Sequence, residues 1–136
     1  MSVRWRSESI HPEEFLLPDR RLVLTLETLS RHVDLIAVTN NPVGVGVATL
    51  DVLGVREHLR EVVGLESTGF SKPSVEPFRE ALRRLGADAE ATISVGDRYD
   101  VDIAPALAVG MGAIHVAGVE EVYQLPGYLR DSGRLD

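Results

Sequence analysis

Short apolar segments rich in β-branched residues alternate with segments of helical periodicity along most of the chain. The predicted strands cover residues 34–38, 62–65, 91–95 and 112–116, and the predicted helices cover 19–32, 45–53, 73–85, 101–109 and 120–129. Strands that alternate with helices are joined by right-handed crossovers and form parallel sheets. We therefore expect an α/β fold with a doubly wound parallel sheet, in which ligands bind beyond the carboxyl ends of the strands.

The composition fits one ordinary domain. The chain has 136 residues, a formal net charge of −7 and no cysteine. An acidic balance argues against nucleic-acid binding, and the lack of cysteine excludes disulfides and thiolate metal sites. The N-terminus is charged where a signal peptide is apolar, and no apolar run is long enough to span a bilayer. We expect a cytoplasmic protein that binds neither nucleic acid nor membrane, with an irregular arm at residues 1–16 and a core domain at 17–136.

Polar residues with complementary chemistry follow three of the predicted strands. Thr39 and Asn40 offer a hydroxyl, an amide and a backbone N–H at the start of a helix, which suits an anion. Lys72 provides a fixed positive charge before the next predicted helix. Asp97 and Asp102 follow a buried strand and are hard oxygen ligands of the kind that Mg²⁺ prefers. Taken singly, each segment reads as a turn, a solvated lysine or a helix cap. Together they describe the electrostatics of phosphoryl transfer.

Three motifs carry a family resemblance. They are Val38-Thr39-Asn40-Asn41, the run from Ser71 to Phe78 and the run from Val95 to Ile103. These segments resemble the second, third and fourth motifs of the haloacid dehalogenase-like (HAD) hydrolases, in the phosphatase-rich branch with a helical cap. The resemblance covers about residues 17–129, and residues 1–16 then correspond to a remnant of the cap. It implies a HAD-like, Rossmann-type core.

The resemblance also implies roles for the strand-end residues. Thr39 would be catalytic and would hydrogen-bond the transferring phosphoryl group, with help from Asn40. Lys72 would be catalytic and would bind phosphate by offsetting the negative charge. Asp97 would hold Mg²⁺, and Asp102 would either position Lys72 or support the metal shell. Magnesium is therefore the implied cofactor, bound weakly in this chain.

The chain departs from the family in its first motif. The family forms an aspartyl-phosphate on the first residue of an Asp-x-Asp motif, at the end of a strand in the middle of the sheet. Before Thr39 the only aspartates are Asp19, in a predicted helix, and Asp34, at the start of a strand. The nucleophile, its strand and nearly all of the cap are therefore absent, and two strand edges are left unpaired. Three remedies are open: the two strands pair directly, the N-terminal arm fills the gap, or another chain supplies a strand in a homo-oligomer.

Four functions follow from these observations. The first is a Mg²⁺-dependent phosphatase core for a small phosphorylated molecule, inactive as this isolated chain because no nucleophile is present. The second is a non-catalytic HAD-like remnant that binds phosphate, a nucleotide or a protein partner. The third is the C-terminal part of a longer enzyme. A receiver-like signalling domain ranks last, because it needs an acidic pair after an early strand and a central acceptor aspartate.

Overall fold

The computed structural model describes residues 16–135. Its helices and strands follow in the order α1 (Arg20–Ser30), β1 (Ile36–Val38), α2 (Val43–Leu53), η2 (Arg56–His58), β2 (Glu61–Val63), α3 (Leu65–Thr68), α4 (Glu76–Leu85), η3 (Ala89–Ala91), β3 (Ile93–Gly96), η4 (Tyr99–Ile103), α5 (Ala104–Ala108), β4 (Gly112–His115), α6 (Val119–Tyr123) and α7 (Leu125–Asp131). The alternation confirms the predicted α/β class. None of the helices within the described part of the chain is long and apolar enough to cross a bilayer. The predicted arm at residues 1–16 lies almost wholly outside the described residues.

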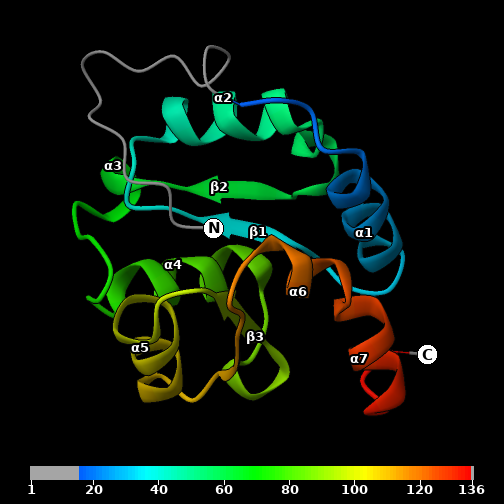
Figure 1. The fold of residues 1–136 in the computed structure, drawn as a ribbon. Helices are drawn as coiled ribbons and strands as arrows, with labels where there is room; N and C mark the ends of the chain where they lie inside the picture. The colour runs from blue at the N-terminus through cyan, green and yellow to red at the C-terminus, as the bar shows by residue number, and fades with distance from the viewer. Residues whose placement is uncertain (1–15, 136) are drawn as a thin grey trace.

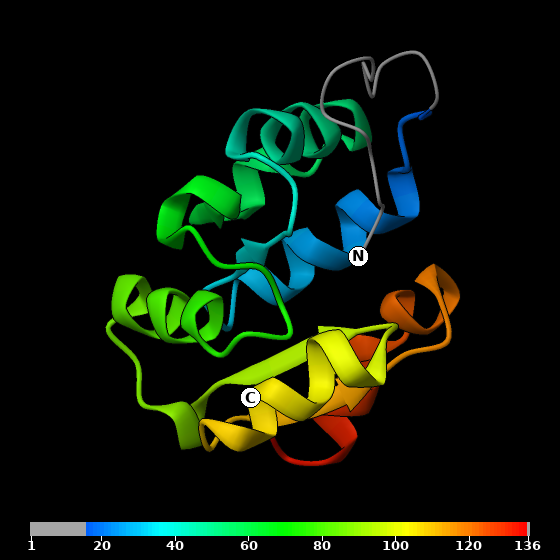
Figure 2. The ribbon, with the colours of Figure 1, turned by 90° about the vertical axis from the view of Figure 1, so that its left-hand side faces the viewer.

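The strands form two parallel pairs that are separate from each other. β1 pairs with β2, with Ala37 opposite Val62, and β3 pairs with β4, with Ser94 opposite Ala113. Within residues 16–135 no ladder joins β1 to β3, so the first of the three remedies for the missing strand does not occur there. Figure 1 shows β1 beside β2 with β3 apart from both, and Figure 2 shows the helices around the strands from a second side.

The helix ends follow local rules in most places. The Asp19 side chain accepts a hydrogen bond from the Leu22 N–H and caps α1, and Gly54 ends α2 at φ 83° in the left-handed region. The predicted start of the third helix at Pro73 is wrong, because Pro73 lies in a turn and α4 begins at Glu76. Pro77 occupies the first turn of α4 instead, where its missing N–H costs nothing.

Two further predicted helices differ from the observed ones. The segment predicted as one helix over residues 101–109 begins as the π-helical turn η4 and continues as α5. The predicted helix over 120–129 is two short helices, α6 and α7. Because a π-turn is selected by tertiary demands and not by residue periodicity, the sequence carries no clear signal for η4.

The core lies mainly between the helices and the strand pairs. Buried side chains form three clusters, which are Leu22 with Leu53 and Val55, Leu29 with Leu125 and Leu135, and Phe78 with Ala106 and Met111. The last cluster joins α4 to α5, and the second joins α1 to α7. The two strand pairs are therefore connected through the helices that flank them.

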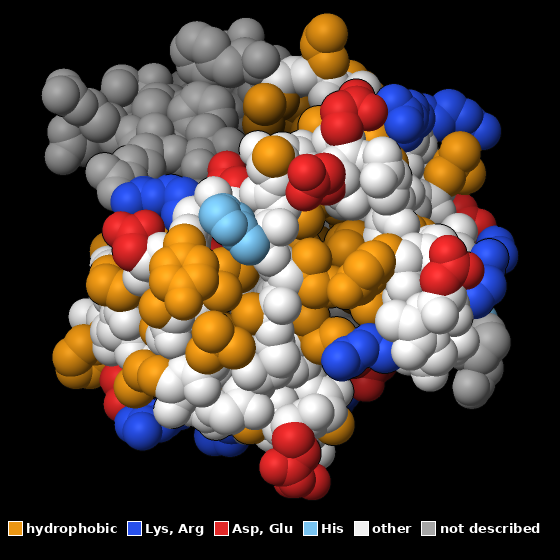
Figure 3. Space-filling view, turned by 60° about the horizontal axis from the view of Figure 1, so that its bottom comes forward, with side chains coloured by type: hydrophobic (Ala, Val, Ile, Leu, Met, Phe, Trp, Pro, Cys, Tyr) orange, Lys and Arg blue, Asp and Glu red, His pale blue; other side chains and the backbone are white. Residues whose placement is uncertain are grey.

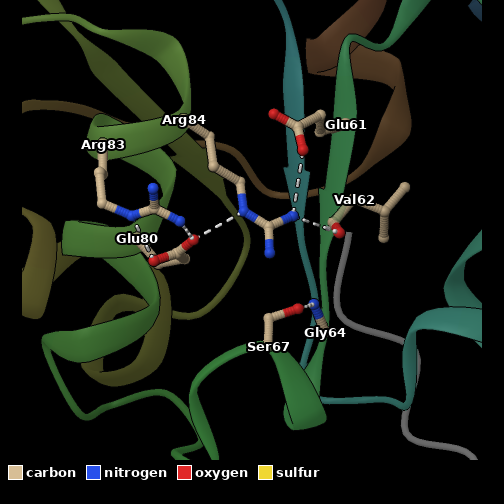
Figure 4. Close-up of polar contacts among 7 residues, drawn as sticks. All are labelled: Glu61, Val62, Gly64, Ser67, Glu80, Arg83 and Arg84. Atoms are coloured by element: carbon tan, nitrogen blue, oxygen red, sulfur yellow. Dashed lines mark hydrogen bonds and ion pairs between the residues drawn. The ribbon is translucent and has the colours of Figure 1, made fainter.

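Arg84 links α4 to β2 through hydrogen bonds and an ion pair (Figure 4). Its Nε lies 2.8 Å from Glu80 Oε2, and its Nη1 lies 3.3 Å from both Glu61 Oε1 and the Val62 carbonyl oxygen. Arg83 also donates to Glu80. The hydrogen bonds from Arg83 and then Arg84 lower the pKa of Glu80 from 4.5 to about 2. Glu80 therefore stays largely ionised down to about pH 2 as long as both guanidinium groups are in place.

Candidate functional site

A buried ion pair between Lys72 and Asp102 forms the centre of the site. Lys72 Nζ lies 2.5 Å from Asp102 Oδ1 and 3.2 Å from the Val38 carbonyl oxygen. Only 6% of the Lys72 side chain and 5% of the Asp102 side chain are exposed. Two charges in such surroundings are tolerated because each neutralises the other and further hydrogen bonds satisfy them. The pair thus ties the carboxyl end of β1 to the segment that follows β3.

The π-turn and a glycine bring Asp102 to this place. Asp102 lies in η4, and its Oδ2 accepts a hydrogen bond of 3.3 Å from the Arg98 N–H. Ser94 Oγ donates to the Asp102 carbonyl oxygen at 2.9 Å. A Cβ at position 96 would overlap the Asp102 side chain, so Gly96 is the residue that permits this close approach. Both carboxylate oxygens of Asp102 are therefore engaged within the protein.

The Asn40 side chain binds the Lys72 backbone through two hydrogen bonds. Its Nδ2 donates to the Lys72 carbonyl oxygen at 3.1 Å, and its Oδ1 accepts from the Lys72 N–H at 2.7 Å. The Lys72–Pro73 peptide bond is cis. The Asn40 side-chain amide, predicted to help bind a phosphoryl group, therefore positions Lys72. The prediction that Asn40 binds phosphate now concerns its backbone N–H alone.

Thr39 and Asp97 lie on the rim around the ion pair. The Thr39 Oγ1 accepts a hydrogen bond of 3.1 Å from the Asn41 N–H, which leaves the hydroxyl proton available to donate. Asp97 is exposed, and its carbonyl oxygen lies 3.0 Å from His115 Nε2. Thr39, Lys72, Asp97 and Asp102 all line one cavity. Four of the five predicted site residues therefore line the cavity, and the fifth, Asn40, contacts Lys72 directly.

This cavity lies between the two strand pairs. Its volume is about 780 Å³, and residues of β1 and β3 line it along with apolar side chains from α1, α4 and α7. Figure 3 shows hydrophobic side chains gathered around a hollow on one face. The cavity is partly open to solvent, so water enters it unless another group is bound.

The residues described here do not complete a magnesium site. Within residues 16–135 no group of three or more histidine or acidic side chains is gathered where it could hold a metal ion. Asp102 is paired with Lys72 and accepts a hydrogen bond from the Arg98 N–H, and its support of a metal shell stays a prediction. Asp97 is then the rim carboxylate available to an ion, and its metal role stays a prediction.

Sequence reasoning missed three contributors to the site. The Val38 carbonyl oxygen accepts from Lys72, Ser94 fixes the backbone at Asp102, and Gly96 makes room for it. The glycine directly before Asp97 was the one available signal, because a glycine at the end of a buried strand often marks a close approach. The other two contacts depend on tertiary structure alone.

Comparison with known proteins identifies the relatives. Glyceraldehyde 3-phosphate phosphatase of Methanothermobacter thermautotrophicus is 42% identical over 64 residues, which are 47% of this chain and 28% of that protein. Ribulose-1,5-bisphosphate 5-phosphatase of Halopiger xanaduensis is 36% identical over 103 residues, which are 75% of this chain and 42% of that protein. The chain thus spans less than half the length of these curated relatives.

Solved structures show the same fold. A 2-haloacid dehalogenase from Pseudomonas syringae pv. Tomato superposes with a TM-score of 0.70 at 31% identity, over 82% of this chain and 53% of that one. The magnesium-bound HAD-hydrolase YfnB of Bacillus subtilis superposes with a TM-score of 0.64 at 26% identity, over 74% of this chain and 51% of that one. The sequence also matches the haloacid dehalogenase-like hydrolase family over residues 5–116, which is most of its length, and the chain therefore belongs to that family.

Proposed function

We propose that this chain is the phosphoryl-binding part of a HAD-type phosphatase for a small phosphorylated metabolite. The observation that carries the proposal is the buried Lys72–Asp102 pair beside the Thr39 hydroxyl, at the carboxyl ends of β1 and β3. The names of the relatives support it, since both phosphatases are named for small phosphorylated sugars or their derivatives. The substrate of this chain is accordingly sought in the same chemical class.

Lys72, Thr39 and Asp97 each have a defined role in this proposal. Lys72 offsets the charge of a phosphoryl group, because its ammonium has three donors and Val38 and Asp102 take two of them. Thr39 donates its hydroxyl proton to a phosphoryl oxygen. Asp97 binds Mg²⁺ weakly, with water and substrate phosphate as the remaining ligands. A bound magnesium ion supplies neutralisation of phosphate charge.

We further propose that the chain has no phosphatase turnover by itself. Asp19 caps α1, and Asp34 Oδ2 lies 3.4 Å from Arg60 Nη1 in an exposed pair before β1. Asp19 does not line the cavity, Asp34 lines it at the amino end of β1 and not at the carboxyl ends of the strands, and Asp102 is committed to Lys72. Without a carboxylate nucleophile, covalent catalysis is lost. These contacts favour, as the second candidate, a non-catalytic module that binds phosphate, a nucleotide or a protein partner.

The test combines turnover with binding. The unmodified chain is assayed with p-nitrophenyl phosphate with and without Mg²⁺, and its binding of inorganic phosphate is followed by titration calorimetry. We expect no Mg²⁺-dependent turnover and measurable phosphate binding. Thr39→Val removes the rim hydroxyl and weakens phosphate binding several-fold, whereas Thr28→Val, on exposed α1 surface, leaves it unchanged.

Two results contradict the proposal. Mg²⁺-dependent turnover that disappears in Asp97→Ala would show that the chain is a complete catalyst. A folded chain that binds no phosphate would remove the phosphoryl-binding role. Binding of ATP much tighter than that of phosphate, with no turnover, identifies the nucleotide-binding form of the second candidate.

A further inference from the structure

We propose that Glu66 is a positioning residue for phosphate binding, because its carboxylate anchors the segment that carries Thr39 and Asn40. Since phosphate binding at Thr39 and Lys72 is itself the proposed function, this role rests on it. Glu66 lies in α3, outside the three sequence motifs, and it does not line the cavity. It would therefore act on the phosphate only through the residues that it holds.

The Glu66 carboxylate binds the amino terminus of α2. Its Oε1 accepts a hydrogen bond of 2.8 Å from the Val43 N–H, which is the first N–H of α2. This N–H has no acceptor within the helix, and a negative charge suits the positive end of the helix dipole. Pro42, the residue before α2, gives no side-chain cap. Glu66 therefore supplies from another element the cap that α2 lacks in its own sequence.

The charge and the exposure of Glu66 fit this role. The hydrogen bond from the Val43 N–H, followed by one from the N–H of Glu66 itself, lowers the pKa of the Glu66 carboxyl below its usual value of 4.5. The carboxylate is therefore ionised at neutral pH. The side chain is exposed, so its replacement leaves no cavity in the core.

The corner that joins β2 to α3 holds the same segment at two further points. The Thr39 N–H donates to the Val63 carbonyl oxygen at 2.9 Å, and the Leu65 N–H donates to the Asn41 carbonyl oxygen at 3.0 Å. Together with Val43, every second residue of the segment is bonded to this corner. The position of the segment therefore depends on the corner and not on its own helix alone.

A glycine allows the corner and the segment to approach each other. A Cβ at position 64 would lie 2.7 Å from the Val43 nitrogen and 2.9 Å from the Asn41 carbonyl oxygen, both closer than a side chain tolerates. The Gly64 N–H donates to Ser67 Oγ at 3.0 Å, a bond that Figure 4 shows. Gly64 and Ser67 therefore fix the start of α3 and with it the place of Glu66.

The anchored segment carries the proposed phosphate contacts at the end of β1. The Asn41 N–H donates to Thr39 Oγ1 at 3.1 Å, so the position of Asn41 sets the direction of the Thr39 hydroxyl. Asn40, between them, binds the N–H and the carbonyl oxygen of Lys72. Release of Val43 therefore changes the separation of the Thr39 hydroxyl and the Lys72 ammonium, which are the two donors proposed for phosphate.

Two substitutions at position 66 isolate the hydrogen bond. Glu66→Ala removes the acceptor, whereas Glu66→Gln keeps an acceptor oxygen in a side chain of nearly the same shape and rescues the contact. The matched control is Asp19→Ala, which removes the cap of α1. Both helices have eleven residues, and Asp19 does not line the cavity. The control therefore shows what the loss of a helix cap does away from the site.

Phosphate affinity, measured by calorimetric titration of inorganic phosphate, is the first readout. We expect Glu66→Ala to bind phosphate about five- to tenfold more weakly, the factor that corresponds to one lost capping hydrogen bond. Glu66→Gln is expected to bind within about twofold of the unmodified chain. Asp19→Ala is expected to lower the urea midpoint at least as much, because Asp19 also accepts from the Tyr123 hydroxyl, and to leave phosphate affinity unchanged.

Hydrogen exchange of the backbone amides is the second readout, and it needs no ligand. The Val43 amide is expected to exchange about five- to tenfold faster in Glu66→Ala and close to the unmodified rate in Glu66→Gln. In Asp19→Ala the Leu22 amide exchanges faster instead, and Val43 is unchanged. A role in overall stability alone does not produce this separation.

Four results overturn the proposal. Unchanged phosphate affinity in Glu66→Ala shows that the anchor has no influence on the rim. Tighter binding in that variant shows that the carboxylate competes with phosphate. Equal losses of affinity in Glu66→Ala and Asp19→Ala show an effect of global stability, and unchanged exchange at Val43 shows that the bond is absent in solution. If the unmodified chain binds no phosphate, the proposed function fails, and the exchange at Val43 still decides whether Glu66 holds the segment.

Discussion

Breaking the buried ion pair is the sharpest perturbation that the structure offers. Asp102→Asn keeps the shape of the side chain but leaves the Lys72 ammonium, 6% exposed, without a counter-charge. The loss of one partner of a buried pair typically costs about 3–5 kcal/mol, against about 0–1 kcal/mol for an exposed pair. Because asparagine retains a hydrogen-bond acceptor, we expect the lower end, about 3 kcal/mol.

Urea unfolding followed by circular dichroism measures this change. With an m-value of about 1.5 kcal/mol per M, a loss of about 3 kcal/mol lowers the unfolding midpoint by about 2 M. The control is the double variant Lys72→Met/Asp102→Leu, which removes both charges and is expected within about 1 kcal/mol of the unmodified chain or above it. If Asp102→Asn does not fold at all, a folded double variant still supports a buried pair.

A small effect would refute the reasoning. If Asp102→Asn costs less than about 1 kcal/mol, Lys72 is solvated in the absence of its partner and the pair behaves as a surface contact. If the double variant is destabilised as strongly as the single one, the cost comes from lost packing and not from the unpaired charge. Either result removes the argument that Asp102 exists to hold Lys72 in place.

Two further predictions concern other contacts. Gly96→Ala forces a Cβ into the Asp102 side chain and is expected to lower the free energy of unfolding by about 1–3 kcal/mol. The control Gly127→Ala has no atom within 4 Å of its Cβ and is expected to raise it by about 0.5–1 kcal/mol. Urea midpoints compare the two variants, and equal effects would contradict the overlap at position 96. Glu80 has a pKa of about 2 in the fold against 4.5 in the unfolded chain, so its contribution to stability is complete above about pH 4.5 and is lost as the pH falls towards 2. In Glu80→Gln the stability therefore falls less between pH 5 and 2, measured by urea midpoints, and an unchanged acid profile would show that the pairing is absent in solution.

The features that the sequence predicts well are those set by neighbouring residues. Gly54 after an apolar segment indicates the end of a helix, and α2 ends there; the cap that Asp19 gives to α1 appears only in the structure. The sequence groups Lys72, Asp97 and Asp102 because strands that alternate with helices place their carboxyl ends at one edge. That grouping needed only the order of elements and not their exact bounds.

The features that escape the sequence depend on contacts between distant segments. Pro73 and Pro77 are both acceptable at a helix start; in the structure Asn40 binds the Lys72 backbone, Pro73 lies in the turn, and α4 begins at Glu76. The π-turn η4 places Asp102 over Gly96, although nothing in its local periodicity requires it. Asn40 itself reads as a ligand-binding amide until the Lys72 backbone is seen to use it.

The gap between the strand pairs links the stability of the fold to whatever fills it. The motifs predict that a strand between β1 and β3 is absent, but the sequence leaves open whether these two strands pair with each other. They do not, and the Lys72–Asp102 ion pair and the cluster around Phe78 connect the two halves instead. A group that enters this space in the folded state alone stabilises the chain by RT ln(1 + [L]/Kd). Because Lys72 and Asp102 line the same space, a group bound there also contacts the residues at which phosphate binding is proposed. Occupancy of this space and affinity for phosphate are therefore coupled, with equal coupling in both directions.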